Sequence, residues 1–247
     1  MSALSALTKS QFRVFLREPL AVFFGLIFPS VLIVVIGAAY PDATNSNTAF
    51  DGRSLVEVYA PTAIILGVTT LAVFLLPVAL GGDREKGILR RLSTTPAHPG
   101  TLVAAHLNVQ MAVTTAATVA AVVVGTLAFP ISLPASAIWF IASFILGAAS
   151  LFAIGLLIGA LAPTANTGQG VGMLLYFPLL FFAGVYVPLE VMSNKIQTIS
   201  SYTPAGAAVE ALASSWSGNS PQTTSLFVMA AYAIACSSIA IRLFRWH

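Results

Sequence analysis

The chain has 247 residues, of which 57% are hydrophobic and only 8% are charged. Soluble domains carry about 25% charged residues, so a chain of this composition could not cover itself with a polar surface. It is therefore predicted to be an integral membrane protein, and its small formal net charge of +3 gives no indication of nucleic acid binding.

Residues 1–18 are predicted to form an amphipathic helix that lies on the membrane surface. Lys9, Arg13 and Arg17 are four residues apart, so they line one face of a helix. The other side of the helix carries Leu4, Leu7, Phe12, Val14 and Phe15. A basic face opposite an apolar face is typical of a helix held at lipid headgroups, and the alternative is a simple basic flank of the first span. Pro19 separates this helix from the span that follows.

Six apolar stretches follow, each near the roughly 20 residues that are needed to cross a bilayer. They are Ala21–Tyr40, Ala60–Leu80, Thr101–Phe129, Ser136–Ala162, Gly168–Val187 and Thr224–Phe244. The predicted fold is therefore an all-α membrane domain of six transmembrane helices that occupies residues 1–247. Six spans place both chain termini on the same side of the membrane.

The stretch Gly81–Pro99 is a charged island between the second and third spans. Its charged residues are Asp83, Arg84, Glu85, Lys86, Arg90 and Arg91. Each charge at a bilayer centre would cost roughly 2.5 to 3.5 kcal/mol, so the island must lie in water. Gly87 predicts a tight backbone turn within a short helix parallel to the membrane. The island is either an ordinary solvated loop or a docking element for a cytoplasmic partner.

The distribution of Lys and Arg predicts which side is cytoplasmic, because cytoplasmic loops carry an excess of both. Nine of these residues fall on one side, and they are Lys9, Arg13, Arg17, Arg84, Lys86, Arg90, Arg91, Arg242 and Arg245. The other side holds Arg53 and Lys195. Both termini and the charged island are therefore predicted to be cytoplasmic.

Residues 188–223 form the last outer segment, and their pattern differs from that of a solvated loop. Apolar residues alternate with polar ones before Pro204, and Ala205 to Trp216 is a good helix former. Two short helices joined at the proline are predicted to re-enter the outer leaflet and cap the bundle, since an unstructured loop of this length would be unusual.

Motifs for catalysis and metal binding are absent from the sequence. It contains no G-x-x-x-x-G-K-[ST] and no H-E-x-x-H, and Cys236 has no histidine nearby. His98 and His106, without a carboxylate cluster, are weak indications of a metal site. The predicted spans carry no mid-membrane ionisable residue, which argues against an ion channel, a proton-driven pump and an intramembrane hydrolase. We expect no catalytic residue, cofactor or metal in this chain.

Several motifs together resemble a known family. The charged island reads Arg84-Glu85-Lys86-Gly87 and then Leu92-Ser93-Thr94-Thr95-Pro96, which is similar to an REKG…L-x-x-T-P pattern. Val187-Pro188-Leu189 and Tyr202-Thr203-Pro204 stand at the expected places of an outer re-entrant segment. With the basic N-terminal helix and six spans, the chain resembles the permease subunit of type-2 ABC exporters, such as bacterial multidrug and antibiotic transporters. These exporters move drugs, antibiotics, lipids or polysaccharide precursors out of the cell.

This resemblance implies partners and roles for the charged residues. In the family the island, here residues 81–99, is the coupling helix that docks on a separate cytoplasmic ABC ATPase, which holds ATP and Mg. The resemblance assigns ATPase coupling to Arg84, Glu85, Lys86 and Gly87, with Asp83, Arg90 and Arg91 nearby. It also implies that Lys9, Arg13 and Arg17 contact the ATPase, and that two ATPase copies serve a permease pair, here expected to be a homodimer in the plasma membrane.

The same resemblance places the substrate path at the dimer interface, along the second and fifth spans. The path residues implied for this chain are Leu66, Thr69, Thr70, Phe74, Tyr176, Phe177, Phe181 and Phe182. Aromatic faces suit planar amphipathic drugs, and the alternative for each residue is packing in the core or against lipid. Gly155 and Gly159 have small-xxx-small spacing, for which packing within one protomer is preferred over dimerisation.

The expected function is ATP-driven export by alternating access, with no catalysis by the chain itself. The alternatives are an energy-independent channel or secondary carrier, and a membrane enzyme.

Overall fold

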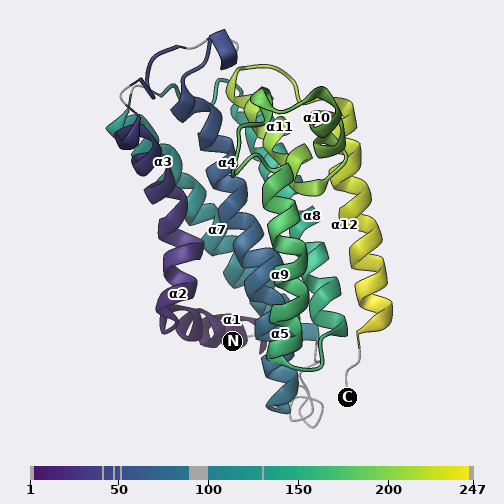
Figure 1. Cartoon of the computed structure of the whole chain (residues 1–247). Coiled ribbons are helices and arrows are strands. Elements are labelled where there is room, and N and C mark those ends of the chain that lie inside the picture. Colours follow the sequence, from purple (N-terminus) through teal and green to yellow (C-terminus); the bar gives the residue numbers. More distant parts are fainter. Residues whose placement is uncertain are drawn as a thin grey trace.

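Long helices that run side by side form the body of the molecule (Figure 1). The computed structural model describes residues 3–40, 42–46, 48–50, 52–88, 100–129 and 131–244. Within these ranges every regular element is a helix, which confirms the predicted all-α class.

Helix α1 (Ala3–Leu16) lies across the lower end of the bundle in Figure 1 and packs against α7 (Gly100–Ala128). The lower end is called the basic end here, because Lys9, Arg13 and Lys86 lie exposed on its elements. No residue of α1 is fully buried, so this helix is an attachment to the bundle rather than part of its core.

Pro19 separates α1 from the first span, as predicted, but the span begins at Pro19 itself instead of Ala21, with Glu18 at the N-cap position. It runs through α2 (Pro19–Val22), a π-helical turn η1 (Phe23–Ile27) and α3 (Phe28–Ala39). The second span has the same construction, with α4 (Leu55–Thr69), a π-helical turn η3 (Thr70–Leu75) and α5 (Leu76–Glu85). Turns of this kind are rare, and the two lie in contact here.

The second span is longer than the sequence predicted at both ends. It begins at Leu55 instead of Ala60, because Ser54 and Glu57 form a capping box that satisfies the first backbone N–H groups. It also continues beyond Leu80 to Glu85, so the first part of the charged island extends the span and is not a separate surface helix. The helix ends at Glu85, and the φ of 68° at Gly87, two residues later, confirms the predicted tight turn.

Five helices of the described chain are long and apolar enough to cross a membrane: Pro19–Ala39, Leu55–Glu85, Gly100–Ala128, Ala137–Leu161 (α8) and Thr223–Leu243 (α12). They correspond to five of the six predicted spans. The sixth prediction falls on α9 (Ala165–Phe182), whose first half contains Asn166, Thr167 and Gln169 and is too polar to meet the same criterion. Helix α9 nevertheless runs along the bundle beside α5 and η3.

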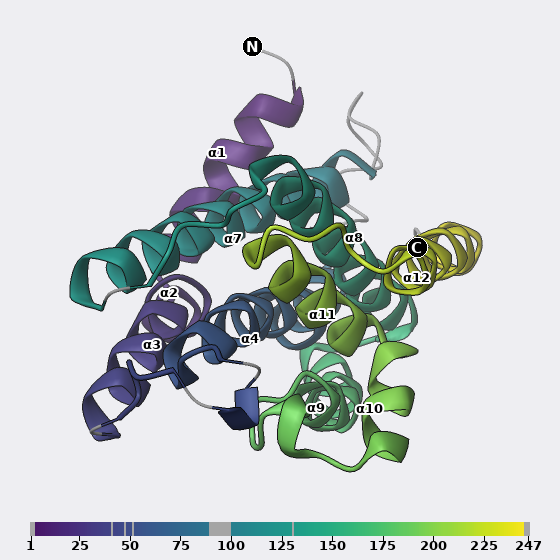
Figure 2. The same ribbon diagram turned by 90° about the horizontal axis from the view of Figure 1, so that it is seen from above.

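The opposite end of the molecule, called the capped end here, carries short helices. They are η2 (Thr48–Phe50), η4 (Leu189–Val191), α10 (Asn194–Ser201) and α11 (Pro204–Trp216). Pro204 is the first residue of α11 and the Thr203 hydroxyl accepts from the Gly206 N–H at 3.1 Å, which confirms two helices joined at the proline. Figure 2 shows α11 near the centre of the bundle, where its alanine face is buried against α8 and α12.

Glycine faces hold the second span close to α8 and α9. A Cβ on Gly172 would lie 2.7 Å from the Val73 carbonyl oxygen, and one on Gly159 would lie 2.6 Å from Leu80. A Cβ on Gly155 would collide with the backbone oxygen of Ala72. These contacts lie within one chain, which confirms the packing preferred for Gly155 and Gly159.

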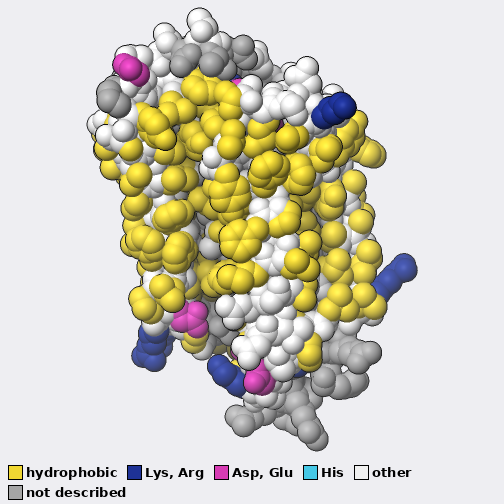
Figure 3. Space-filling model, viewed as in Figure 1, with side chains coloured by type: hydrophobic (Ala, Val, Ile, Leu, Met, Phe, Trp, Pro, Cys, Tyr) yellow, Lys and Arg dark blue, Asp and Glu magenta, His cyan; other side chains and the backbone are white. Residues whose placement is uncertain are grey.

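The outer surface between the two ends is apolar. Figure 3 shows hydrophobic side chains across the middle of one face, with charged side chains toward its ends. Leu174 and Ile241 are each 74% exposed, and Phe227 is 73% exposed. Such a surface would be unstable in water and suits the hydrocarbon core of a bilayer.

Candidate functional site

The charged end of α5 contacts three other helices of the described chain through polar side chains at the basic end. Asp83, Arg84 and Glu85 form its last turn and are followed by Lys86 and Gly87. The N–H groups of Lys86 and Gly87 donate to the carbonyls of Gly82 and Arg84, which completes the helix before the chain leaves it. This turn therefore presents three consecutive charged side chains in fixed directions.

Asp83 contacts α7 through His106. Its Oδ2 lies 2.8 Å from Nε2 of His106, and the two side chains are only 14% and 9% exposed. The contact gives each of these two buried polar side chains, one on α5 and one on α7, a hydrogen-bond partner. In the sequence His106 gives only a weak indication of a metal ligand, and no local signal predicts this pair.

Arg84 contacts the C-terminal end of α8. Its guanidinium donates to the carbonyls of Gly159 at 3.2 Å, Ala160 at 3.3 Å and Ala162, and it lies 5.3 Å from the ring centre of Phe244. The last carbonyls of a helix lack partners within the helix and carry partial negative charge, so a guanidinium is well suited to them. The Arg84 side chain is thus directed into the protein.

Glu85 contacts the start of α9. Its Oε2 accepts a hydrogen bond of 3.3 Å from the N–H of Ala165, the first residue of that helix, where a carboxylate is favoured by the helix dipole. Three consecutive residues therefore hold three different helices, α7, α8 and α9. We call Asp83, Arg84 and Glu85 with these contacts the α5 junction.

The remaining residues of the predicted coupling set differ in their positions. Lys86 is exposed, and a Cβ on Gly87 would meet no atom within 4 Å, so both are open to a partner. Arg90 and Arg91 lie outside the described residues, as does the Thr-Pro part of the motif. Lys9, Arg13 and Arg17 are exposed at the same end of the molecule.

The residues predicted for a substrate path fall into two groups. Leu66 and Thr69 are 4% and 0% exposed, so they lie in the core of this chain. Around η3, however, the structure brings polar and aromatic groups together. The Thr70 hydroxyl donates to the Leu66 carbonyl at 2.7 Å, and its oxygen lies 2.8 Å from the Tyr176 hydroxyl, which is the donor in that pair.

Aromatic rings continue from this hydrogen bond along α9. The ring of Tyr176 lies 5.9 Å from that of Phe74 and 5.7 Å from that of Phe177, within the range of favourable ring pairs. Phe181 and Phe182 form a second pair at 5.4 Å. Phe177 is 51% exposed and Phe181 is 37% exposed, so these two can touch a partner or a substrate directly.

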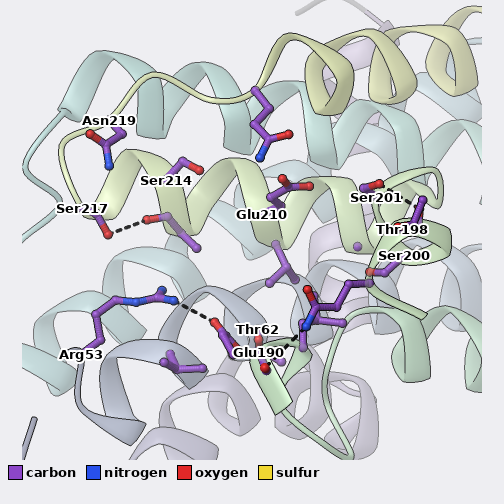
Figure 4. A pocket seen from close by; sticks show the side chains of 17 residues that line it. Arg53, Thr62, Glu190, Thr198, Ser200, Ser201, Glu210, Ser214, Ser217 and Asn219 are labelled. Carbon is purple, nitrogen blue, oxygen red and sulfur yellow. Dashed lines mark hydrogen bonds and ion pairs between the residues drawn. The ribbon is translucent and has the colours of Figure 1, made fainter. Parts of the chain in front are cut away.

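A polar cavity lies at the capped end, between α4, η4, α10 and α11. Its volume is about 780 Å³, and Figure 4 shows the side chains that line it. On one side Arg53 and Glu190 form an ion pair of 2.9 Å, and on the other Glu210 accepts a hydrogen bond of 3.1 Å from the Ser225 hydroxyl. The sequence predicts two capping helices at this end but gives no indication of a cavity.

No group of three His, Cys, Asp or Glu side chains that could hold a metal occurs in the described parts of the chain.

A family model described as "ABC-2 type transporter" matches residues 2–216. No curated protein matches the chain.

Proposed function

Since this chain belongs to the ABC-2 type transporter family, we propose that it is the permease of an exporter driven by a separate cytoplasmic ABC ATPase. The cargo proposed is an amphipathic drug, antibiotic or lipid-like molecule, which leaves the cell by alternating access. Two copies of the chain and two ATPase subunits, each with its ATP and Mg, would form the working complex. The chain itself carries out no bond chemistry.

The placement of charge supports the orientation required for this function. Lys9, Arg13, Arg17 and Lys86 lie exposed at the basic end, whereas the capped end has Arg53 and Lys195. An excess of Lys and Arg marks the cytoplasmic side of membrane proteins, so the basic end would face the ATPase.

The α5 junction is the observation that carries the proposal. Lys86 and Gly87 are accessible to a partner, and the three residues just before them are held to α7, α8 and α9. A displacement of the loop by the ATPase would therefore move the ends of three helices together with the second span. Such a rigid connection is what a coupling element needs, because force is transmitted through packed, hydrogen-bonded elements.

The second span also connects the junction to the proposed path. It passes from Glu85 through α5 to η3, where Thr70 meets Tyr176 of α9. A movement that begins at the junction would reach the aromatic side chains that the cargo is proposed to contact.

The test is a charge reversal at the exposed part of the coupling set. The chain is co-purified with its ATPase and reconstituted into liposomes, and ATP hydrolysis and cargo efflux are measured for Lys86→Glu. We expect cargo to stop stimulating hydrolysis and efflux to fall by about tenfold or more, because a reversed charge repels the docking surface. The matched control is Lys195→Glu, an exposed lysine at the capped end, which should behave as the parent.

Two results would count against the proposal. One is full coupled transport by Lys86→Glu. The other is cargo movement by the purified chain without nucleotide or ATPase, which would instead indicate a channel or secondary carrier.

A further inference from the structure

The cavity at the capped end has an unusual balance of charge. Of the described side chains that line it, Arg53 is the one cation, whereas Glu190 and Glu210 are both carboxylates. Arg53 is already engaged, because it donates to Glu190 at 2.9 Å and to the Phe50 carbonyl at 3.4 Å. Glu210 is left with the neutral Ser225 hydroxyl, so the cavity has one net negative charge that no lining cation balances.

Most of the hydroxyl groups that line the cavity donate their hydrogens to the backbone. Four of them donate to carbonyls: Thr198 to Asn194, Ser200 to Phe182, Ser201 to Thr198, and Ser217 to Ala213. A hydroxyl has one hydrogen and two lone pairs, so these groups can offer a ligand only their oxygens as acceptors.

The side-chain amide of Gln197 also donates its hydrogens to the backbone. Its Nε2 donates to the carbonyls of Met192 at 2.9 Å and Glu190 at 3.4 Å, which leaves its Oε1 as an acceptor. These five side chains therefore offer a ligand only acceptors, whereas Thr62, Ser214, Asn219 and Gln222 also line the cavity and can still donate. Figure 4 shows Glu210 on α11 with its carboxylate on the side of the helix away from the Arg53–Glu190 pair.

We infer that this cavity binds the ammonium group of an organic amine, with Glu210 as its counter-ion. An ammonium group has three donors and no acceptor, so it can pair with the carboxylate and with hydroxyl oxygens whose hydrogens are already used. Val58, Leu189 and Val209 add an apolar part that can cover a carbon skeleton, and about 780 Å³ is within the range of small-molecule sites. A bare metal ion suits the site less well, since the described residues offer no cluster of three ligating side chains.

The place of this site in transport rests on the proposed function. If the capped end is the outer end, the amine is cargo held after the inner path has closed and before release. Binding itself requires neither the ATPase nor nucleotide, so it can be tested on the isolated chain.

The test uses the whole chain in lipid nanodiscs, with dansylcadaverine as a fluorescent primary amine and its N-acetylated form as a neutral probe of the same shape. Fluorescence anisotropy is measured against empty nanodiscs, which accounts for partition into lipid. We expect saturable binding of the amine but not of the acetylated probe. Glu210→Gln should weaken amine binding by about tenfold or more, because it removes the charge but keeps an acceptor for Ser225.

Asp42→Asn is the matched control, because Asp42 is an exposed carboxylate in the first loop of the same end and does not line the cavity. It should bind dansylcadaverine like the parent. Three results would each overturn the inference. They are equal affinity of Glu210→Gln and the parent for dansylcadaverine, equal binding of the acetylated probe, and displacement of dansylcadaverine by Mg²⁺ at the concentration at which a competing amine displaces it. If a variant folds poorly, the comparison of the two probes on the unmodified chain still tests the inference.

The outcomes also separate this inference from the proposed function. Amine binding without ATP-driven efflux would support the amine site and contradict the proposed exporter function. ATP-coupled efflux without saturable amine binding would support the exporter and contradict the amine site.

Discussion

Asp83 and His106 lie 2.8 Å apart, although 23 residues separate them in the chain. The pair joins the last turn of α5 to the first part of α7, on the two sides of the loop between these helices. Both side chains are largely withdrawn from water, so removal of either leaves the other with a buried polar group and no partner. The pair therefore fixes the distance between the two helices from which the loop emerges.

A double-mutant cycle on this pair measures its contribution. We expect Asp83→Ala and His106→Ala each to lower the free energy of unfolding by about 1 to 3 kcal/mol, and the double variant to lose less than the sum. Thermal unfolding of the detergent-solubilised chain provides the measurement, and Asn108→Ala, an exposed position on α7, is the control. Additive losses would show that the two residues do not interact.

Arg84→Lys tests whether the guanidinium holds the end of α8. A lysine ammonium cannot reach Gly159, Ala160 and Ala162 as a planar fork, so the last turn of α8 should open more often. We expect amide hydrogen exchange in residues 158–162 to rise by about tenfold. Lys86→Arg, which alters the exposed cation two positions further on, should leave that exchange unchanged. Equal protection in both variants would mean that the carbonyls are satisfied without Arg84.

Two glycines of α9 should respond in opposite ways to the same substitution. Gly172→Ala places a Cβ 2.7 Å from the Val73 carbonyl oxygen and should cost about 1 to 3 kcal/mol, because α9 must move away from the second span. Gly170→Ala meets nothing within 4 Å and should be neutral or stabilise the helix by up to about 1 kcal/mol. Melting temperatures from size-exclusion profiles of heated samples compare the two. A Gly172→Ala protein as stable as the parent would contradict the close packing.

Substitution of exposed residues of the proposed path should change the response to different compounds, whereas substitution of a buried residue should lower stability. Phe177→Ala and Phe181→Ala remove exposed rings, so they should change which compounds stimulate the ATPase while leaving assembly intact. Leu66→Ala removes a buried side chain and should instead lower stability by about 2 to 5 kcal/mol. The measurement is ATPase stimulation across a panel of amphipathic compounds. An unchanged compound profile in both phenylalanine variants would remove these rings from the path.

The number and order of the long helices could be read from the sequence, because the length of an apolar run is a local property. The turn at Gly87 and the starts of α2 at Pro19 and α11 at Pro204 were also predictable, since glycine and proline restrict the backbone wherever they stand. The Ser54–Glu57 capping box was visible as a Ser-x-x-Glu pattern and would have corrected the start of the second span. Helix α9 was the weakest of the span predictions, because its first half is polar and its position depends on glycine packing against α5 and η3.

Tertiary structure alone decided the partners of the polar side chains. The sequence placed Arg84 and Glu85 in one charged island, but only the fold directs Arg84 to the end of α8, Glu85 to the start of α9 and Asp83 to His106. Likewise, nothing local marks Glu210 as a cavity carboxylate that no cation of the described lining balances. The physical reason is range: hydrophobicity and backbone preference act within a few residues, whereas a buried polar group is satisfied by whichever helix end or side chain the packing brings within 3 Å or so.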